Sequence, residues 1–176
     1  MIYYNVGSLV IRDMIKGEAE IFSAEERAQG WAGATPDKLN NRIAQRDRGE
    51  CVLLTAVYNG EPAGYVSIYP NAPIGPFANM NIPEVVDFNV LVKYRGNGIG
   101  WRLLDVCEMI AAEKCDRICL GVGLYRDYGR AQRMYVKRGY IPDGSGVWYG
   151  DRNIDPGEDC CNDDELVLFL SKELKK

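Results

Sequence analysis

Residues that could carry chemistry are concentrated between Glu84 and Gly100, where a β-forming run leads into a glycine-rich turn. The pattern predicts a buried strand, then the turn, then a long amphipathic helix that begins near Trp101. The first amides of a helix have no acceptor inside the helix and lie at the positive end of its dipole. Glycines let a diphosphate approach such amides closely. The stretch therefore predicts a site for a pyrophosphate-containing cofactor, and the alternative is a glycine-rich connection that binds no ligand.

The spacing of the glycines narrows the class of cofactor. A dinucleotide-binding turn has the pattern G-x-G-x-x-G, and here Gly96 and Gly98 fit but the third position is Trp101. A Walker loop ends in lysine and a hydroxyl residue, which this turn lacks. The pattern that is present is Arg-x-x-Gly-x-Gly, at Arg95, Gly98 and Gly100.

Composition excludes several classes of function. The chain has 176 residues, no histidine and a net charge of −4 with both signs interspersed. Without histidine, a zinc enzyme or a Ser-His-Asp hydrolase is not expected, and the mixed charge does not predict a nucleic-acid groove. The first thirty residues lack a secretory pattern, and no run approaches the ~20 apolar residues of a membrane span, so the cytoplasm is expected. The six cysteines form no C-x-x-C pair, and Cys107 and Cys119 are predicted to be core residues.

The elements that must position the glycine turn follow from hydrophobic periodicity and turn signals. They predict a mixed α+β chain with the order β-α-α-β-β-β-α-β-α-β-β. A capping-box pattern at Ser23 predicts a helix toward Trp31, and Asn59-Gly60 predicts a hairpin. The expected strands are 2–12, 51–58, 62–69, the run from Glu84, 117–122, a strand at Trp148-Tyr149, and 165–170; the other expected helices are 35–48, the one from Trp101 to Lys114, and 129–138.

A second motif lies near residue 135. The segment Ala131–Tyr140 has the pattern A-x-x-x-Y-x-x-x-G-[FY]. Together with Arg-x-x-Gly-x-Gly at the expected separation, it resembles the GNAT N-acetyltransferase superfamily, and the element order matches as well. The resemblance implies the GNAT acyl-CoA N-acyltransferase fold, with a central, mostly antiparallel sheet whose strands 4 and 5 splay apart, as one domain over 1–176. It implies acetyl-CoA as co-substrate and no metal.

The resemblance also implies roles for individual residues. Glu84 is the implied general base, because an apolar setting would raise its pKa, and Tyr135 is the implied acid for the leaving thiolate. The alternatives for the base are Asp87, if a bulge shifts the strand register, and a chain of water molecules; for Tyr135 the alternative is a core tyrosine. The main chain of Val90 would pair with pantetheine and the amide of Phe88 would stabilise the carbonyl oxygen. The implied cofactor-binding residues are Phe88, Asn89, Val90, Arg95, Gly96, Asn97, Gly98, Ile99, Gly100, Trp101 and Tyr128.

One position departs from the family pattern. Many members have an asparagine near the pantetheine, three residues before the motif alanine, whereas this chain has Tyr128.

The chemical class of the amine that would accept the acetyl group is indicated only by the charge of one segment. The segment Gly150–Asp164 is acidic with a single arginine; in the family the corresponding loop often borders the acceptor entrance. A small cationic amine is therefore expected, and the alternative is an ordinary solvated loop. Pro70–Phe77 is a candidate wall of the acceptor pocket. A protein or peptide N-acetyltransferase and a non-catalytic acyl-CoA-binding module remain alternatives, as does assembly into a homodimer.

Overall fold

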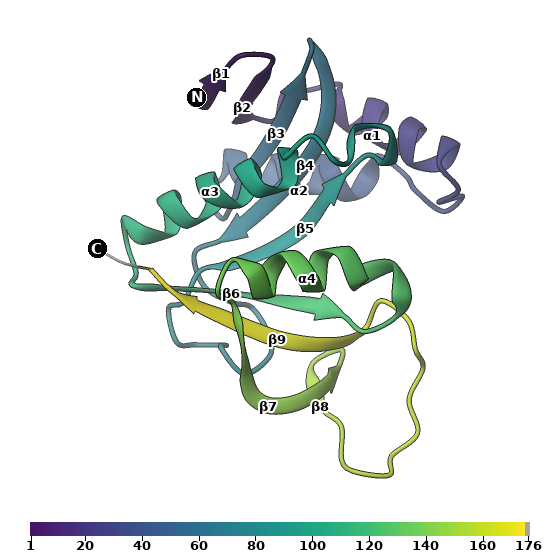
Figure 1. Ribbon diagram of the computed structural model, residues 1–176, viewed down its shortest axis with the longest axis vertical. Coiled ribbons are helices and arrows are strands. Elements are labelled where there is room, and N and C mark those ends of the chain that lie inside the picture. Colours follow the sequence, from purple (N-terminus) through teal and green to yellow (C-terminus); the bar gives the residue numbers. More distant parts are fainter. Residues whose placement is uncertain (175–176) are drawn as a thin grey trace. The chain divides into compact units, whose positions relative to one another are not determined.

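The computed structural model describes residues 1–174 and has mixed α+β architecture (Figure 1). No helix in this range is both long and apolar enough to cross a membrane. The elements in chain order are β1 (Ile2–Val6), β2 (Leu9–Asp13), α1 (Glu18–Ala28), α2 (Asp37–Asp47), β3 (Val52–Tyr58), β4 (Glu61–Tyr69), β5 (Glu84–Val90), the 3-10 turn η1 (Val92–Tyr94), α3 (Ile99–Ala112), β6 (Arg117–Gly123), η2 (Arg126–Tyr128), α4 (Gly129–Lys137), β7 (Ile141–Tyr149), β8 (Arg152–Asn153) and β9 (Leu166–Glu173).

The chain divides into two compact units. The first comprises Met1–Ile68 and Val86–Met109, and the second comprises Tyr69–Val85 and the chain from Ile110 onward. The hydrogen-bonded strand order is β1-β2-β3-β4-β5-β6-β9-β7-β8 in one mixed sheet. Strand β5 is divided between the units: its first two residues belong to the second unit and the rest belong to the first.

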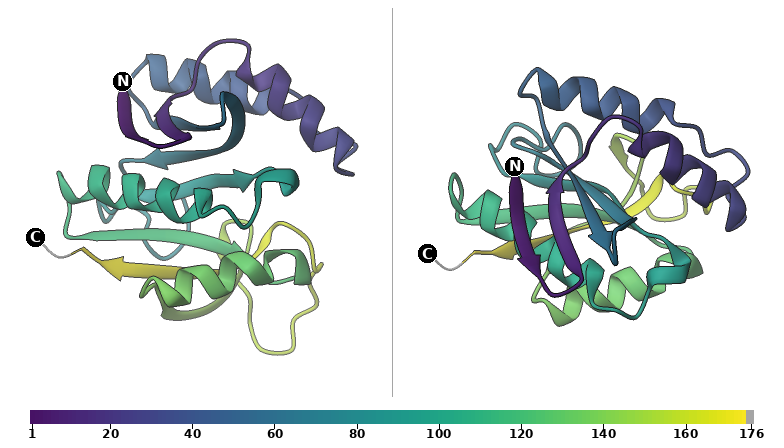
Figure 2. Two further views of the ribbon diagram at one scale, coloured as in Figure 1. Left: turned by 45° about the horizontal axis from the view of Figure 1, so that its top comes forward. Right: turned by 90° about the horizontal axis from the view of Figure 1, so that it is seen from above.

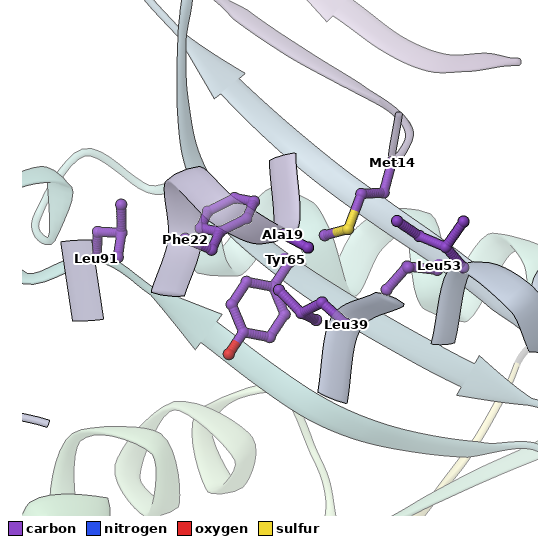
Figure 3. Packing of buried hydrophobic residues seen from close by; sticks show 8 residues of the cluster. Met14, Ala19, Phe22, Leu39, Leu53, Tyr65 and Leu91 are labelled. Carbon is purple, nitrogen blue, oxygen red and sulfur yellow. The ribbon is translucent and has the colours of Figure 1, made fainter. Parts of the chain in front are cut away.

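The first unit is built on antiparallel hairpins. The β3–β4 hairpin turns at Asn59 and Gly60, which have φ angles of 53° and 87°. Those left-handed angles suit a two-residue hairpin turn, and asparagine and glycine adopt them at little cost. Helices α1 and α2 lie over one face of these strands and α3 lies over the other (Figure 2). Apolar side chains of α1, α2, β3 and β4 form the core between them, with Phe22 against Tyr65 at its centre (Figure 3).

The second unit pairs β6 with β5 in parallel and with β9 in antiparallel fashion. The β5–β6 pairs are Glu84↔Cys119 and Val85↔Leu120, at the start of β5. Strand β9 also pairs with β7, and α4 runs beside β6 and β9 (Figure 1). The loop that follows β4 has no helix or strand between residues 70 and 83, as expected from its prolines, and its Phe77 packs edge-on against Phe169.

Three predicted elements differ in the structure. The expected strand 2–12 is a hairpin of β1 and β2, because Gly7 has a φ of 60° and reverses the chain. The predicted helix start at Ser23 is wrong: α1 begins at Glu18, and the Ser23 hydroxyl donates to the Glu20 carbonyl inside the helix. Strand β7 begins at Ile141, earlier than expected, and the two-residue β8 was not predicted.

The early start of α1 has a tertiary cause. The Glu18 carboxylate is buried and pairs with Arg12 of β2 at 2.7 Å. It also accepts hydrogen bonds from the Thr55 hydroxyl and from the Ile15 amide, both at 2.9 Å. Two of these partners come from strands, so the local capping pattern could not indicate them.

Candidate functional site

The turn between η1 and α3 has the geometry of an anion site. Gly96 and Gly98 have φ angles of 90° and 75°, which are readily accessible only to glycine. The first helical hydrogen bond runs from the Arg102 amide to the Gly98 carbonyl at 3.1 Å. The amides of Ile99 and Gly100 therefore lie in the first turn of α3, where the helix offers no acceptor. That turn contains no acidic residue, so its positive end is not neutralised from within.

The space beside this turn is open, as a phosphate group that approaches the amides requires. A Cβ atom placed on Gly96 or Gly98 would meet no other heavy atom within 4 Å. The stretch from Arg95 to Gly98 is exposed, and Trp101 is 41% exposed. Ile99 is buried and anchors the start of the helix. The residues present thus fit a diphosphate held by main-chain amides.

Two side chains predicted to bind the cofactor hold the turn in shape. Arg95 Nε donates to the Val90 carbonyl at 2.9 Å, which ties the turn to the end of β5. Asn97 Nδ2 donates to the Tyr94 carbonyl at 3.0 Å, and its Oδ1 accepts from the Tyr58 hydroxyl at 3.4 Å. These bonds favour the main chain, rather than the Asn97 amide group, as the part of the turn available to a ligand.

Strand β5 contains a left-handed residue at Asp87, whose φ is 53°. A left-handed residue interrupts the alternation of side chains between the two faces of a strand, so Asp87 need not point away from the face that Glu84 occupies in a regular strand. Its carboxylate pairs with Lys38 at 3.0 Å and with Arg42 at 2.7 Å, both from α2. Burial alone would raise the pKa of Asp87, but these two cations outweigh it and hold the pKa below its ordinary value. Asp87 is therefore an ionised, paired carboxylate and a weak base.

The residues on either side of Phe88 are held from the same face of the unit. Asn89 is buried, and its Nδ2 donates to Glu26 Oε1 at 2.8 Å. The Tyr65 hydroxyl donates to the same oxygen at 2.6 Å, from the rim of the core cluster (Figure 3). The Asn89 carbonyl approaches Gly64 so closely that a Cβ there would lie 2.7 Å from it. Phe88 is thus flanked by two residues whose side chains are fixed, one by α2 and one by α1.

In the second unit, Glu84 is a buried carboxyl group with an unsatisfied oxygen. Its exposed fraction is 4%, and Oε2 has no hydrogen-bond partner among the described residues. Burial raises its pKa from 4.5 to about 7. Its register partner Cys119 is fully buried and donates to the Pro83 carbonyl; burial and the Glu84 charge raise the pKa of that thiol.

Helix α4 and the 3-10 turn η2 before it carry the two predicted tyrosines of this unit. Tyr135 is buried, and its ring packs against Tyr140 with 5.8 Å between centroids. Gly139, with a φ of 86°, ends the helix. Tyr128 lies in η2, just before the helix, and its hydroxyl donates to Asp164 at 2.8 Å.

The predicted site residues fall in both units. Phe88 to Trp101 lie together in the first, and Glu84, Tyr128 and Tyr135 lie in the second. The sequence predicted no role for Lys38 and Arg42. Their spacing of four residues placed them on one side of α2, but nothing local showed that a strand carboxylate would lie beside them.

Comparison with known proteins agrees with this geometry. The family model described as "Acetyltransferase (GNAT) family" matches residues 16–140. The chain therefore belongs to the GNAT acetyltransferase family, and the family and fold predictions are confirmed. Enzymes of this family use acetyl-CoA, so the cofactor prediction is confirmed as well. No curated protein sequence matches this chain.

Solved structures show the same fold at low sequence identity. An N-acetyltransferase from Staphylococcus aureus Mu50 is 17% identical, with a TM-score of 0.70, over 96% of this chain and 100% of that one. The yncA structure from Salmonella typhimurium with its cofactor acetyl-CoA is 16% identical, with a TM-score of 0.66, over 97% and 96%. A ribosomal-protein-alanine N-acetyltransferase from Brucella melitensis is 18% identical, with a TM-score of 0.66, over 93% and 99%.

Proposed function

We propose that this chain transfers the acetyl group of acetyl-CoA to a primary amine, by direct attack in a ternary complex, and that the amine belongs to a small cationic molecule. The observation that carries the proposal is the buried Glu84 carboxyl, whose Oε2 has no hydrogen-bond partner within residues 1–174 and whose pKa is about 7. A module that only binds acyl-CoA has no need for such a group. An unsatisfied buried carboxyl destabilises the fold, and a pKa near the working pH is what a general base requires.

The reaction divides the work among a few groups of the chain. Bound acetyl-CoA supplies the thioester that is attacked. Glu84 Oε2 accepts a proton from the amine, and the Phe88 amide donates to the carbonyl oxygen as it gains charge, a contact worth ~3 kcal/mol in comparable sites. The Tyr135 hydroxyl protonates the leaving sulfur. The main chain of Val90 aligns the donor, and the amides at the start of α3 hold the diphosphate.

The substrate class rests on charge. The segment 150–164, which includes β8, carries exposed carboxylates at Asp151, Asp155 and Asp159, and its one arginine, Arg152, is paired with Glu158. A cationic acceptor would be attracted to this surface. An alternative acceptor is a protein or peptide amine; the name of the Brucella melitensis structure gives a ribosomal-protein alanine as the group on which that protein acts.

The decisive experiment measures thiol release. The purified protein is incubated with acetyl-CoA and a panel of polyamines, aminoglycosides, amino acids and peptides, and free coenzyme A is followed with a thiol reagent. Release with small cationic amines and not with peptides supports the proposal. Release only with peptides assigns the protein acceptor, and tight coenzyme binding without release for any amine refutes the enzymatic role.

A further inference from the structure

Two tyrosines before α4 donate hydrogen bonds to the same carboxylate oxygen. The hydroxyls of Tyr125 and Tyr128 lie 2.6 Å and 2.8 Å from Asp164 Oδ1. Their rings meet edge to face, with centroids 5.0 Å apart. Asp164 belongs to the long loop between β8 and β9, whose course is seen in yellow-green in Figure 1. The pair therefore joins the β6–α4 connection to the last part of that loop.

The Tyr128 ring is held in place by packing against Gly123. It lies directly over Gly123 at the end of β6, where any side chain would overlap the ring carbons. The Gly123 carbonyl accepts a hydrogen bond from Gln132 of α4 at 2.8 Å. Glycine at 123 and a helix bonded to it leave the ring little freedom, so its hydroxyl is presented to Asp164 at low entropic cost.

Other contacts hold the same end of the loop. The Tyr149 hydroxyl donates to Asp163 Oδ2 at 3.0 Å, and the Glu165 amide donates to Asp163 Oδ1 at 3.0 Å. The hydrogen bond to Asp164 raises the pKa of Tyr125 to about 12, and burial followed by the same bond raises the pKa of Tyr128. Both hydroxyls are therefore neutral donors at physiological pH, as the carboxylate acceptor requires.

We propose that Tyr125 and Tyr128 determine acceptor affinity by latching the acidic loop 150–164 through Asp164. This rests on the proposed function, and it changes the role of position 128 from a contact with the cofactor to a residue that positions the acceptor side of the site. Tyr125, Tyr128 and Asp164 are positioning residues: the latch keeps the exposed carboxylates of the loop in a fixed arrangement, so that a cationic amine meets them preorganised.

The latch is first tested without any activity. In the full chain, hydrogen–deuterium exchange is measured for peptides covering 158–166, in the parent protein and in Tyr125→Phe, Tyr128→Phe and the double variant. Loss of hydroxyl donors to a charged acceptor should speed exchange there about tenfold in the double variant. Tyr3→Phe is the matched control, because it removes a tyrosine hydroxyl bonded to Asp13 in the other unit. Unchanged exchange in the double variant overturns the latch.

Kinetics then separate the two roles of Tyr128. With the latch, Tyr128→Phe and Asp164→Ala raise the KM of the cationic acceptor about fivefold to tenfold, while kcat and the calorimetric Kd for acetyl-CoA change by less than about twofold. Asp164→Asn, which keeps an acceptor oxygen, should recover part of the loss. A raised Kd for acetyl-CoA with an unchanged acceptor KM would instead make Tyr128 a cofactor contact and overturn the proposal. If the parent releases no thiol with any amine, the proposed function fails, while the exchange experiment still decides the latch.

Discussion

Two carboxylates on β5 differ in acid strength because their surroundings differ. Glu84 is buried, its Oε2 meets no hydrogen-bond partner in the described part of the chain, and its pKa rises to about 7. Asp87, three residues later, is paired with Lys38 and Arg42, and its pKa is lowered. Titratable neighbours pushed apart in this way are typical of acid–base sites. The comparison favours Glu84 over Asp87 as the proposed base.

The base role predicts a pH-dependent rate. A base must be deprotonated, so kcat/KM should rise with pH through about 7 and then level off. Glu84→Gln should lower kcat at least ~100-fold and remove this limb of the pH profile. The measurement is thiol release across the pH range. If Glu84→Gln keeps the parent's rate and the same rise of kcat/KM with pH, a chain of water molecules, and not Glu84, removes the proton from the amine.

The same group makes stability depend on pH, which provides the folding control. The folded-state pKa is raised from 4.5 to about 7, so the folded protein binds more protons between these values. Its contribution to stability is complete below about pH 4.5 and is lost as pH rises through about 7. Parent stability should therefore fall by about 3 kcal/mol across this window relative to Glu84→Gln in denaturant titrations.

Tyr135 is tested by removing its hydroxyl alone. Tyr135→Phe keeps the buried ring beside Tyr140, so the fold should be retained. Turnover should fall at least about tenfold, because the leaving thiolate loses its proton donor, while acetyl-CoA affinity changes little. Turnover equal to that of the parent in the same thiol assay would make Tyr135 a core tyrosine.

At the scale of elements, α2 pairs with the left-handed residue of β5, Asp87. A left-handed aspartate costs roughly 1 kcal/mol or more, and the two α2 cations are the contacts that stabilise it. The neighbouring Phe88 amide is the proposed donor to the carbonyl oxygen. A small rotation of this peptide would misdirect that donor, which links the surface of α2 to the rate of the reaction.

This link distinguishes a positioning role of Asp87 from a base role. Arg42→Gln and Asp87→Asn should each lower kcat about fivefold to tenfold with little change in acetyl-CoA Kd. Arg48→Gln, just after the same helix, is the control, because the ion pair of Arg48 is with exposed Glu50, two residues away. A loss of ~100-fold or more for Asp87→Asn beside full activity for Arg42→Gln would restore Asp87 as the base.

The start of α3 is tested through its glycine. Gly98→Ala introduces a methyl group where the structure leaves open space and at a φ of 75°. Acetyl-CoA Kd should rise at least about tenfold, because the diphosphate meets the methyl group. Gly7→Ala is the matched control: its φ is 60° and its surroundings are equally open, but it lies in the β1–β2 turn. Equal Kd values for the two variants, by calorimetry, would remove the diphosphate from this turn.

At the scale of the molecule, the charge of the chain carries a prediction about the proposed acceptor. The chain carries a net charge of −4, with exposed carboxylates in the segment 150–164. If the loop attracts a cationic acceptor, acceptor KM should rise severalfold as salt increases from about 50 to about 300 mM. An uncharged amine of similar size is the control. Identical salt profiles for the two amines would show that the loop does not steer the acceptor.

The single-domain prediction stays a prediction, since the described residues cluster into two units. One family model nevertheless matches residues 16–140, which belong to both units. We therefore retain one domain over 1–176 as our proposal.

Predictions from local signals agree best with the structure. The Asn59-Gly60 hairpin, the order of β5, turn and α3, and the end of α4 at Gly139 are set by backbone preferences within a few residues. The predicted start of α1 was wrong because the first residue of the helix, Glu18, is held by Arg12 and Thr55 from strands β2 and β3. The pairing of Arg42 with Asp87 was not predicted, since the two residues are 45 positions apart in the sequence.

By itself, the amino-acid sequence determined the family, the fold class and the turn proposed to bind the diphosphate, because glycine spacing and helix periodicity act over short distances. The tertiary structure decided which side chains face one another. It buried the Glu84 carboxyl, placed two cations beside Asp87, and turned the Tyr128 hydroxyl toward Asp164. Burial and ion pairing depend on distant segments that no local pattern specifies, and these two effects set the proposed chemistry.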